Sequence, residues 1–295
     1  MSDLLILMST YNGEKYLPEL LDSVYKQTYG NVDLLVRDDG STDNTLHILN
    51  EYAANHRIQI LYGKNIGAAE SFFKLVEQAS DSYDYYAFCD QDDVWLPKKL
   101  ARAVDRLSEL DSNTPNLYYS GQILVDENLK TISRHRLTLN RSYRANFIFN
   151  QMAGCTAVLN RKLFSLLKLY KPVDVFMHDA WCYKMCVTCG GNVVVDDKEY
   201  ILYRQHGGNT VGLNNSLSGK FKQVQSHMVE SPSSYARELK KGYSSFIDPE
   251  WRTFLDALLD KKLSNRLRLL FDPDIRFESL PLKAIFILKI IVGKY

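Results

Sequence analysis

The sequence has almost no net charge, because 36 Lys and Arg balance 35 Asp and Glu to give a formal charge of +1 at pH 7. A protein that binds nucleic acid through a broad basic face has a large surplus of Lys and Arg, so we expect no nucleic-acid partner. The charge is unevenly distributed, however. Basic residues exceed acidic ones in residues 261–295, after a mildly acidic body.

Long apolar runs and an export signal are also missing. No stretch reaches the ~20 apolar residues that a membrane-spanning helix requires. The first residues, MSDLLILMSTYN, have no basic leader and only a short apolar run, unlike a signal peptide. The five cysteines are odd in number, which does not indicate a disulfide framework. We therefore expect a reduced, cytoplasmic protein.

Absent motifs narrow the enzyme classes further. The sequence has no GxxxxGK[ST] phosphate loop, no GxGxxG after its first apolar run and no HExxH. A kinase and a dinucleotide-dependent enzyme are therefore disfavoured. Cys182, Cys186 and Cys189 recur at helical spacing without a second CxxC pair elsewhere. This pattern favours small core residues on a helix over a zinc site.

The first part of the chain alternates between strand and helix patterns. Strands are predicted over 3–9, 32–40 (with a turn at its end), 57–63 and 83–89, and helices over 13–28, 41–56, 68–80 and 97–110. This alternation implies a mostly parallel sheet with helices on both faces. Residues 115–204 are predicted to be richer in strands, a Gly/Asn-rich loop follows over 205–216, and helices are predicted near 217–229, 233–246 and 250–270.

Polar clusters follow three of these strands, at 9–12, 38–39 and 90–93. Ligands bind parallel sheets at the carboxyl ends of strands, so one cleft can collect all three clusters. Asp90, Asp92 and Asp93 would repel one another unless a cation lay between them. A hard divalent ion suits such oxygen ligands, and a solvated acidic turn that caps the next helix is the alternative. A metal ion held by carboxylates, in a sequence without a phosphate-binding loop, indicates a reaction in which the metal neutralises a diphosphate leaving group.

Two residues of the other clusters suit a nucleobase. Tyr11 could lay its ring on the base, although surface packing explains it equally well. Asp39 could accept the N3–H of uracil or thymine, and the alternative is a turn residue in the sequence DDGSTD.

Four segments together resemble the donor half of a family 2 glycosyltransferase of the GT-A fold: STYNGEKYLPELLDSVYKQTY, VRDDGSTDNT, KNIGAAESF and FCDQDDVWLPKKL. The resemblance implies an α/β, Rossmann-like fold with a mostly parallel central sheet, flanking helices and a helical C-terminal extension. It divides the chain into a catalytic domain over 1–212, with a donor half (1–125) and an acceptor half (126–212), and a helical region over 213–295.

The resemblance also implies which residues hold the donor, a nucleoside-diphosphate sugar. Ser9, Tyr11 and Asp39 would bind the nucleotide. Asn65 and Gly67 stand where a loop of the family approaches the donor.

The metal site follows from the same resemblance. Asp92 and Asp93 would form the Asp-x-Asp-type site for Mn²⁺ or Mg²⁺, with Asp93 on the metal and Asp92 on the metal and the ribose. Asp90 would be the first acid of an Asp-Gln-Asp-Asp variant, beside the donor. His206 has two interpretations: a neutral imidazole that completes the metal shell, or a loop histidine between a strand and a glycine pair.

Asp179, in MHDAW, fits the position of the family's catalytic base, and the alternative is a helix N-cap. The base would take a proton from an acceptor hydroxyl that attacks the anomeric carbon in line, with inversion. Gly154 and Thr156 stand where the acceptor pocket is bordered in similar enzymes. Arg204 could meet either a phosphate or a carboxylate of the fold.

The combination HDAW…YRQHGGNTVG resembles the rhamnosyltransferase-like branch that builds bacterial surface polysaccharides. It implies dTDP-L-rhamnose as the donor and a lipid-linked or growing glycan as the acceptor. Transfer from a UDP-hexose or UDP-N-acetylhexosamine is the alternative, and a catalytically silent scaffold that binds a nucleotide sugar is another. A nucleotidyltransferase is disfavoured, because STYNGEKY is not a Gly-rich basic loop, and no QxxRW indicates a processive synthase.

The C-terminal segment, LPLKAIFILKIIVGK, is apolar and too short to span a membrane. It follows a basic segment, so we expect peripheral contact with an anionic membrane, at the inner face of the cell membrane. Packing on the body of the protein or on a second copy, as a homodimer, is the alternative.

Overall fold

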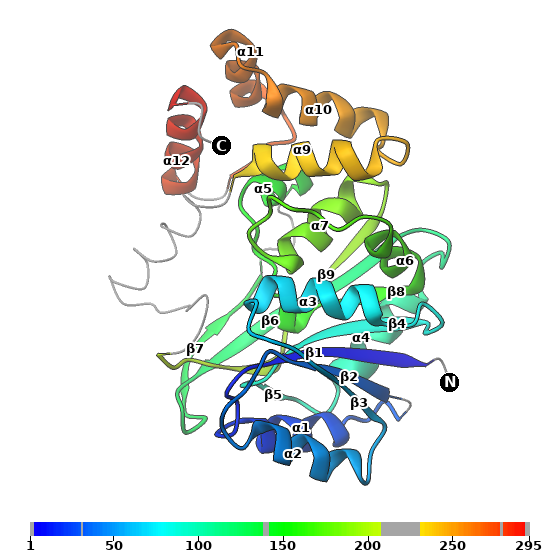
Figure 1. Ribbon diagram of the computed structural model, residues 1–295. Helices are drawn as coiled ribbons and strands as arrows, with labels where there is room; N and C mark the ends of the chain where they lie inside the picture. Colours follow the sequence, from blue (N-terminus) through cyan, green and yellow to red (C-terminus); the bar gives the residue numbers. More distant parts are fainter. Residues whose placement is uncertain (1–2, 31, 138–141, 208–230, 278–279, 293–295) are drawn as a thin grey trace.

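The computed structural model describes residues 3–30, 32–137, 142–207, 231–277 and 280–292 (Figure 1). Its first half runs through β1 (Leu4–Thr10), α1 (Leu17–Tyr25), β2 (Val32–Asp38), α2 (Thr45–Ala53), β3 (Ile58–Tyr62), α3 (Ala68–Gln78), β4 (Tyr85–Asp90), β5 (Val94–Trp95) and α4 (Lys99–Ser108). The pairs β3–β2, β2–β1 and β1–β4 are all parallel. The predicted alternation and its parallel sheet are confirmed here.

The second half extends the same sheet with strands of both directions. It contains β6 (Asn116–Val125), β7 (Thr131–His135), α5 (Tyr143–Ile148), η1 (Gly154–Thr156), β8 (Val158–Asn160), α6 (Arg161–Leu169), α7 (His178–Thr188) and β9 (Asn192–Arg204). The strand order is β3-β2-β1-β4-β8-β6-β9-β5, and β7 pairs with β6. Strand β8 is antiparallel to both β4 and β6, whereas β9 is parallel to β6. A short turn joins β6 to β7, which permits only antiparallel pairing.

Both faces of the sheet are buried. Leu5 and Leu7 of β1 belong to a core that includes residues of α3, α6 and α7, whereas Leu4, Ile6 and Met8 belong to a core with α1, α2 and α4. Successive residues of a strand face opposite sides, so an unbroken apolar run such as β1 requires cover on both faces. Figure 1 shows α3 and α7 on one side of the sheet and α1 and α2 on the other.

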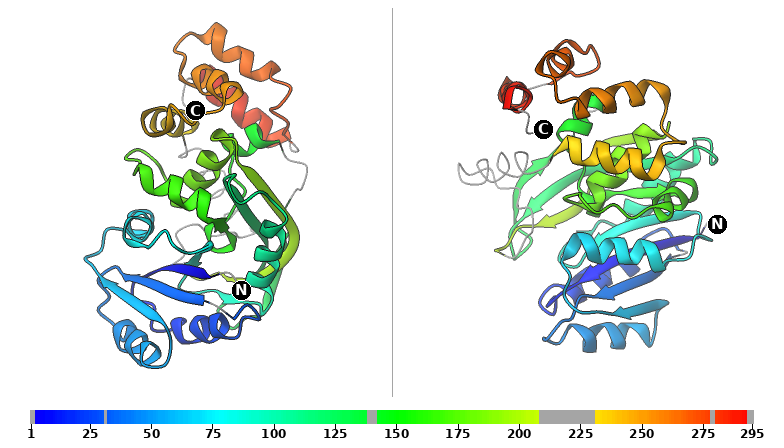
Figure 2. Two further views of the ribbon diagram at one scale, coloured as in Figure 1. Left: turned by 90° about the vertical axis from the view of Figure 1, so that its right-hand side faces the viewer. Right: turned by 45° about the horizontal axis from the view of Figure 1, so that its top comes forward.

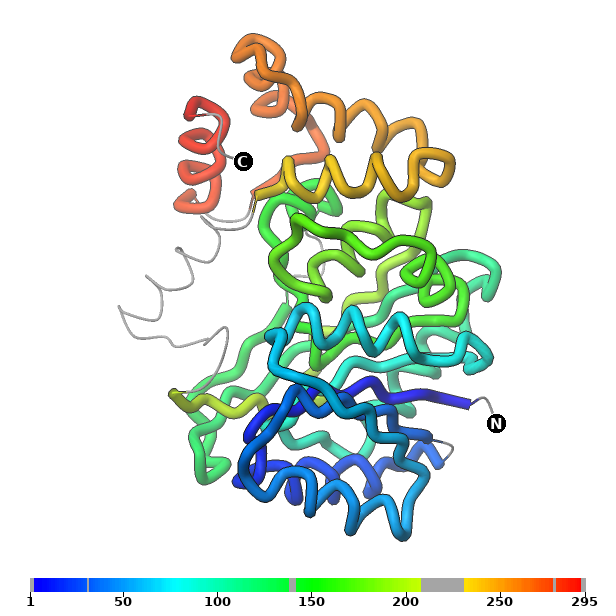
Figure 3. Tube along the Cα trace, viewed as in Figure 1, coloured from blue at the N-terminus to red at the C-terminus, as the bar shows by residue number. Residues whose placement is uncertain are grey.

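The helical C-terminal region consists of α9 (Pro232–Tyr243), α10 (Pro249–Leu259), α11 (Leu263–Leu267), η2 (Arg268–Phe271) and α12 (Leu280–Val292). Tyr235 and Phe254 share a core with Trp181 of α7, so α9 and α10 pack directly on the preceding domain (Figure 2). The last helix, α12, contacts α11 and lies far from β1 (Figure 3). The helix predicted near 217–229 lies outside the described residues. Of the helices that are described, none is both long and apolar enough to cross a membrane.

Candidate active site

The carboxyl ends of β1, β2 and β4 bring the three predicted polar clusters to one edge of the sheet. Strand β1 lies between β2 and β4, so the loops that follow these strands are neighbours. The main-chain N–H of Asp39 donates to the carbonyl of Thr10 at 2.7 Å. The main-chain N–H of Tyr11 donates to Oε1 of Gln91 at 2.8 Å. Residues from all three clusters are thus linked by hydrogen bonds.

The nucleotide-binding residues predicted after β1 differ in orientation. The Ser9 hydroxyl donates to Oγ of Ser71 on α3 at 2.6 Å, so this side chain faces into the protein. The Tyr11 side chain points outward and the residue is 44% exposed. An exposed ring at a strand end is the geometry that base stacking requires.

Asp39 is buried and anchors the loop that contains Asn65 and Gly67. Its carboxylate forms an ion pair with Arg37 and accepts hydrogen bonds from the N–H of Ile66 at 3.0 and 3.1 Å and of Gly67 at 2.9 Å. Gly67 has a φ of 85°, a backbone conformation that favours glycine. Asp39 therefore already has donors on both oxygens, and a nucleobase N3–H would share an oxygen with one of them.

Asp92 is in direct contact with His206, which follows β9. Nε2 of His206 lies 2.7 Å from Oδ2 of Asp92, and each side chain is 15% exposed. The pairing of β5 with β9, which places Val94 opposite Leu202, returns the end of β9 to the aspartate turn. Two residues predicted for the metal site are therefore in direct contact.

Asp93 lies deeper and is completely buried. Its Oδ1 accepts a hydrogen bond from the N–H of Arg204 at 3.1 Å. The Arg204 guanidinium donates to the carbonyl of Asp92 at 2.8 Å and to Oε2 of Glu19 at 2.6 Å. We considered two partners for Arg204, a phosphate and a carboxylate of the protein, and the structure shows a carboxylate, that of Glu19. Arg204 thereby fixes the main chain that carries Asp92 and Asp93.

Burial and mutual repulsion raise the pKa values of the inner carboxyl groups. Loss of hydration, followed by the charges of Asp92 and Asp179, raises the pKa of Asp90 to about 7. Loss of hydration, followed by Asp92 and Asp90, raises the pKa of Asp93 well above its ordinary value. A nearby divalent cation would lower both pKa values, because it favours the ionised carboxylates.

The donor set suits a hard divalent ion. Among the described residues, Oδ2 of Asp93 is buried without a hydrogen-bond partner. Ligand atoms of Asp90, Asp93 and Cys155 all lie within 4.8 Å of one another. Burial raises the pKa of the Cys155 thiol, so the thiol stays protonated and is a poor metal ligand. Asp92 and His206, which contact each other, are not members of this group, so the described side chains offer two sets of ligands of the type that Mn²⁺ or Mg²⁺ takes: Asp90 with Asp93, and Asp92 with His206.

Lys99 is a buried cation that the sequence did not single out. It lies on α4, and its Nζ is 3.5 Å from the centroid of the Trp95 ring. In the described part of the chain this Nζ has no hydrogen-bond partner. Burial lowers the pKa of Lys99 to about 8, although the negative charges of Asp93 and Asp90 oppose this shift. The aspartate cluster therefore has a positive charge of the protein itself nearby.

Asp179 lies in the first turn of α7, but it is not the N-cap, which is Met177. Its Oδ2 accepts a hydrogen bond from the N–H of Gly154 at 2.9 Å and its Oδ1 from the N–H of Ala180 at 2.7 Å. A Cβ on Gly154 would lie 3.1 Å from Cβ of Asp179, so Gly154 permits a close approach. Because the sulfur of Cys155, next to Gly154, lies within 4.8 Å of carboxylate oxygens of Asp90 and Asp93, the acceptor half meets the aspartate cluster. Thr156 is buried, and its hydroxyl donates to a carbonyl in its own turn.

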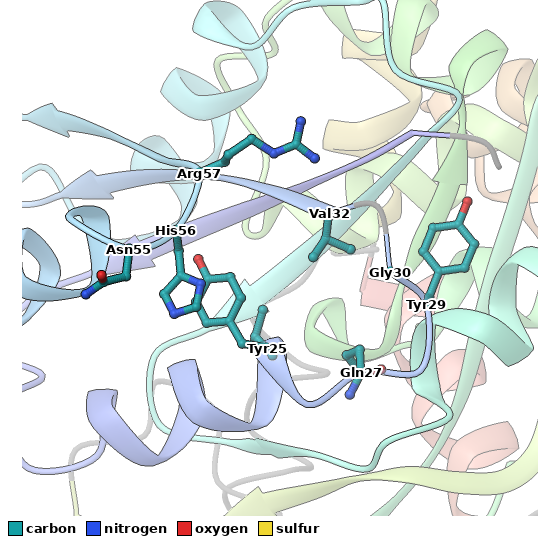
Figure 4. Close-up of a pocket in the computed structure, with 9 residues that line it drawn as sticks. Tyr25, Gln27, Tyr29, Gly30, Val32, Asn55, His56 and Arg57 are labelled. Atoms are coloured by element: carbon teal, nitrogen blue, oxygen red, sulfur yellow. The ribbon is translucent and has the colours of Figure 1, made fainter.

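A cavity of about 260 Å³ lies away from this site (Figure 4). It is lined by Tyr25, His56 and residues just before β2 and β3, at the amino ends of these strands. The rings of Tyr25 and His56 stack with centroids 3.6 Å apart. The aspartates are at the carboxyl edge of the sheet, so this cavity is not part of the candidate active site.

The fold and the carboxylate-rich edge of its sheet define a nucleotide-sugar glycosyltransferase of the GT-A class. Residues 5–167 match the model of the family "Glycosyl transferase family 2", and the chain belongs to this family. The dTDP-rhamnosyl transferase RfbG of Shigella flexneri is 33% identical over 231 residues, which cover 74% of this chain and 78% of RfbG. The glucosyltransferase WfgD of Escherichia coli, named for UDP-Glc and a GlcNAc-diphosphoundecaprenol, is 34% identical over 54% of this chain and 61% of its own length.

Solved structures confirm the fold. S. aureus TarS 1-349 in complex with UDP-GlcNAc superposes with a TM-score of 0.61 at 18% identity, covering 99% of this chain and 82% of that one. The mannosyltransferase PcManGT of Pyrobaculum calidifontis, in complex with GDP-Man and Mn²⁺, superposes with a TM-score of 0.57 at 17% identity. The superposition covers 100% of this chain and 83% of PcManGT. At these identities the likeness concerns the fold alone.

Proposed function

We propose that the chain is a metal-dependent, inverting glycosyltransferase that transfers L-rhamnose from dTDP-L-rhamnose to a lipid-linked or growing glycan of a bacterial cell surface. The chain belongs to glycosyltransferase family 2, and in addition we propose the donor sugar, the metal and the acceptor. The name of the relative RfbG supports rhamnose. Two sets of side chains, Asp90 with Asp93 and Asp92 with His206, support Mn²⁺ or Mg²⁺.

One observation carries the proposal of a displacement reaction. Asp179 comes from the acceptor half and accepts a hydrogen bond from the N–H of Gly154 at 2.9 Å, and the next residue, Cys155, has its sulfur within 4.8 Å of carboxylate oxygens of Asp90 and Asp93. A base near the diphosphate site is what in-line attack on one sugar requires. The bonds from Gly154 and Ala180 hold the carboxylate of Asp179 in one orientation.

The reaction then follows from these groups. The acceptor hydroxyl gives its proton to the Asp179 carboxylate while its oxygen forms a bond with the anomeric carbon. The bond from that carbon to the diphosphate oxygen breaks, the electron pair stays with the diphosphate, and the configuration inverts. A divalent metal, when bound by Asp92, Asp93 and His206, supplies charge neutralisation for the diphosphate. Asp90 would stand beside the donor.

In the proposal, Tyr11 and Asp39 bind the nucleotide beside the loop of Asn65 and Gly67, and Ser9, whose hydroxyl donates to Ser71, supports this site from inside the protein. The exposed ring of Tyr11 suits a base, and Asp39 would accept its N3–H by sharing an oxygen. Thymine and uracil both carry this N3–H, so the base itself does not decide between the two donor classes. The name of WfgD supports a UDP-hexose as the second candidate donor.

A donor screen tests the proposed function. Purified chain is incubated with Mn²⁺ or Mg²⁺, a lipid-linked acceptor and, in turn, dTDP-L-rhamnose, UDP-glucose, UDP-galactose and UDP-N-acetylglucosamine. We expect release of dTDP to exceed release of UDP, and chelation of the metal to stop it. A preference for a UDP-sugar would replace the rhamnose assignment, and release from no donor would favour a silent scaffold that binds nucleotide sugars.

The C-terminal helix supports peripheral contact with the inner face of the cell membrane. Phe286 and Ile290 of α12 are buried, whereas Leu288, Ile291 and Val292 are more than half exposed. One face of α12 therefore packs on the protein and another is uncovered. The basic side chains of Arg268, in η2 before α12, and of Lys283, within α12, would attract anionic lipid. A second copy of the chain is the alternative occupant of this face.

A further inference from the structure

Gln91 lies between Asp90 and Asp92 and pairs with the main chain of Tyr11. Its Oε1 accepts a hydrogen bond from the N–H of Tyr11 at 2.8 Å, and its Nε2 donates to the carbonyl of Tyr11 at 3.0 Å. One side chain thus satisfies both polar main-chain groups of a single residue. Among natural side chains of this length only an amide carries both the donor and the acceptor that this pairing needs.

The loop after β1 is shaped to admit this amide. A Cβ on Gly13 would lie 2.4 Å from Oε1 of Gln91, closer than real contacts allow. Asn12 has a φ of 48°, the left-handed conformation in which Asn is tolerated. Its N–H donates to Oγ of Ser41 at 2.9 Å, and its Oδ1 accepts from the N–H of Thr42 at 2.8 Å. The turn that carries Tyr11 is thereby held from two sides, by Gln91 and by the loop after β2.

We propose that Gln91 is a positioning residue that couples the nucleoside site at Tyr11 to the metal site at the aspartate turn. A divalent ion on Asp92 fixes the turn that contains Gln91. The fixed amide then fixes the main chain of Tyr11, whose exposed ring faces the base. By linkage, a nucleoside on Tyr11 tightens metal binding by the same factor. The inference rests on the proposed function, because it requires both sites.

A nucleoside without phosphate tests this coupling, because it cannot contact the metal through a diphosphate. Equilibrium dialysis measures the dissociation constants of labelled thymidine and uridine with and without saturating Mn²⁺. In the unaltered chain we expect Mn²⁺ to tighten binding of at least one nucleoside by at least about 5-fold, the lower end of common coupling factors. In Gln91→Met, which keeps the length but has no hydrogen-bonding amide, we expect less than about 2-fold.

Two further variants separate coupling from a folding defect. Gly13→Ala introduces the Cβ that meets Oε1 of Gln91, so it should also lose the coupling while Gln91 is intact. Gln59→Met, an exposed position on β3, should retain it. Thermal unfolding confirms that each variant is folded.

An equal effect of Mn²⁺ in the unaltered chain and in Gln91→Met would overturn the inference, as would no effect in the unaltered chain. Dialysis of dTDP and UDP with Mn²⁺ distinguishes this from failure of the proposed function. If the unaltered chain binds these diphosphates but shows no nucleoside coupling, the inference alone is wrong. If it binds neither diphosphate, the proposed function is wrong and the inference falls with it.

Discussion

Nε2 of His206 lies 2.7 Å from Oδ2 of Asp92, although 114 positions separate the two residues in the chain. Asp92 follows a parallel strand of the donor half, whereas His206 follows β9 of the acceptor half. Contact between them joins the two halves at the candidate metal site. The His206 ring also lies against Tyr16, with centroids 5.0 Å apart, which restricts its orientation.

This contact predicts that His206 contributes to metal affinity. We expect His206→Ala to weaken Mn²⁺ binding by about 10–100-fold, because either a ligand or the group that orients Asp92 is lost. Electron paramagnetic resonance of free Mn²⁺ measures the affinity. His47→Ala, at an exposed position on α2, is the matched control and should bind as the unaltered chain does. Equal affinities in all three proteins would exclude His206 from the metal site.

The raised pKa of Asp90 predicts a pH-dependent effect of Asp90→Asn on stability. The folded chain holds this proton up to about pH 7, whereas the unfolded chain releases it near its ordinary pKa of 3.8. Stability that comes from the protonated carboxyl is therefore full below about pH 4 and is lost as the pH rises through 7. The Asn variant has no carboxyl group at position 90 and does not lose this contribution. Without metal it should therefore gain up to about 4 kcal/mol over the unaltered chain between pH 4 and 7.5, at about 1.4 kcal/mol for each unit of the pKa shift.

Urea unfolding of both proteins at a series of pH values measures this difference. The comparison between variants is needed because His178 has the opposite effect: burial lowers its pKa to about 3, so its contribution to stability rises with pH between about 3 and 6.5. His178 is present in both proteins and cancels in the difference. A difference that does not change with pH would show that Asp90 is ionised at pH 5.

The uncovered face of α12 predicts membrane binding that depends on exposed side chains. We expect the pair Leu288→Ser and Ile291→Ser to lower recovery with anionic liposomes by at least about 10-fold in flotation, because each apolar side chain contributes of the order of 1 kcal/mol or more. Both residues are exposed, so the fold should persist. Leu169→Ser, at an exposed position on α6, is the control. Equal recovery would favour a second copy of the chain, which sedimentation velocity detects.

The sequence predicted the donor half of the site because parallel strands impose a simple geometry. Strand ends that alternate with helices must meet at one edge of the sheet, so Tyr11, Asp39 and the aspartates had to be neighbours. The ion pair of Arg37 with Asp39 also had a signal, since residues two apart on a strand face the same side. We did not use this signal, so the sequence did not lead us to expect that Asp39 already has hydrogen-bond partners within the protein.

Other contacts had no sequence signal. The place of His206 depends on the pairing of β9 with β5, a strand of two residues that no periodicity reveals. Lys99 lies in a run of basic residues that is typical of an exposed helix start, yet it is buried beside Trp95. Gln91 was not singled out from the sequence. Its role depends on the left-handed turn at Asn12, which appears only when the loop is folded.

The rate of glycosyl transfer by the variant Asp179→Asn tests most directly the central claim, that Asp179 is the catalytic base. The amide keeps the shape of the side chain but cannot take a proton, so turnover with dTDP-L-rhamnose, Mn²⁺ and a lipid-linked acceptor should fall by about 10²–10⁴-fold. Binding of dTDP with Mn²⁺ should stay within about 3-fold, since Asp179 lies on the acceptor side. Lost turnover with retained binding is the result that the account predicts. Unchanged turnover in a variant that binds dTDP would contradict it, because the proton would then leave by another route.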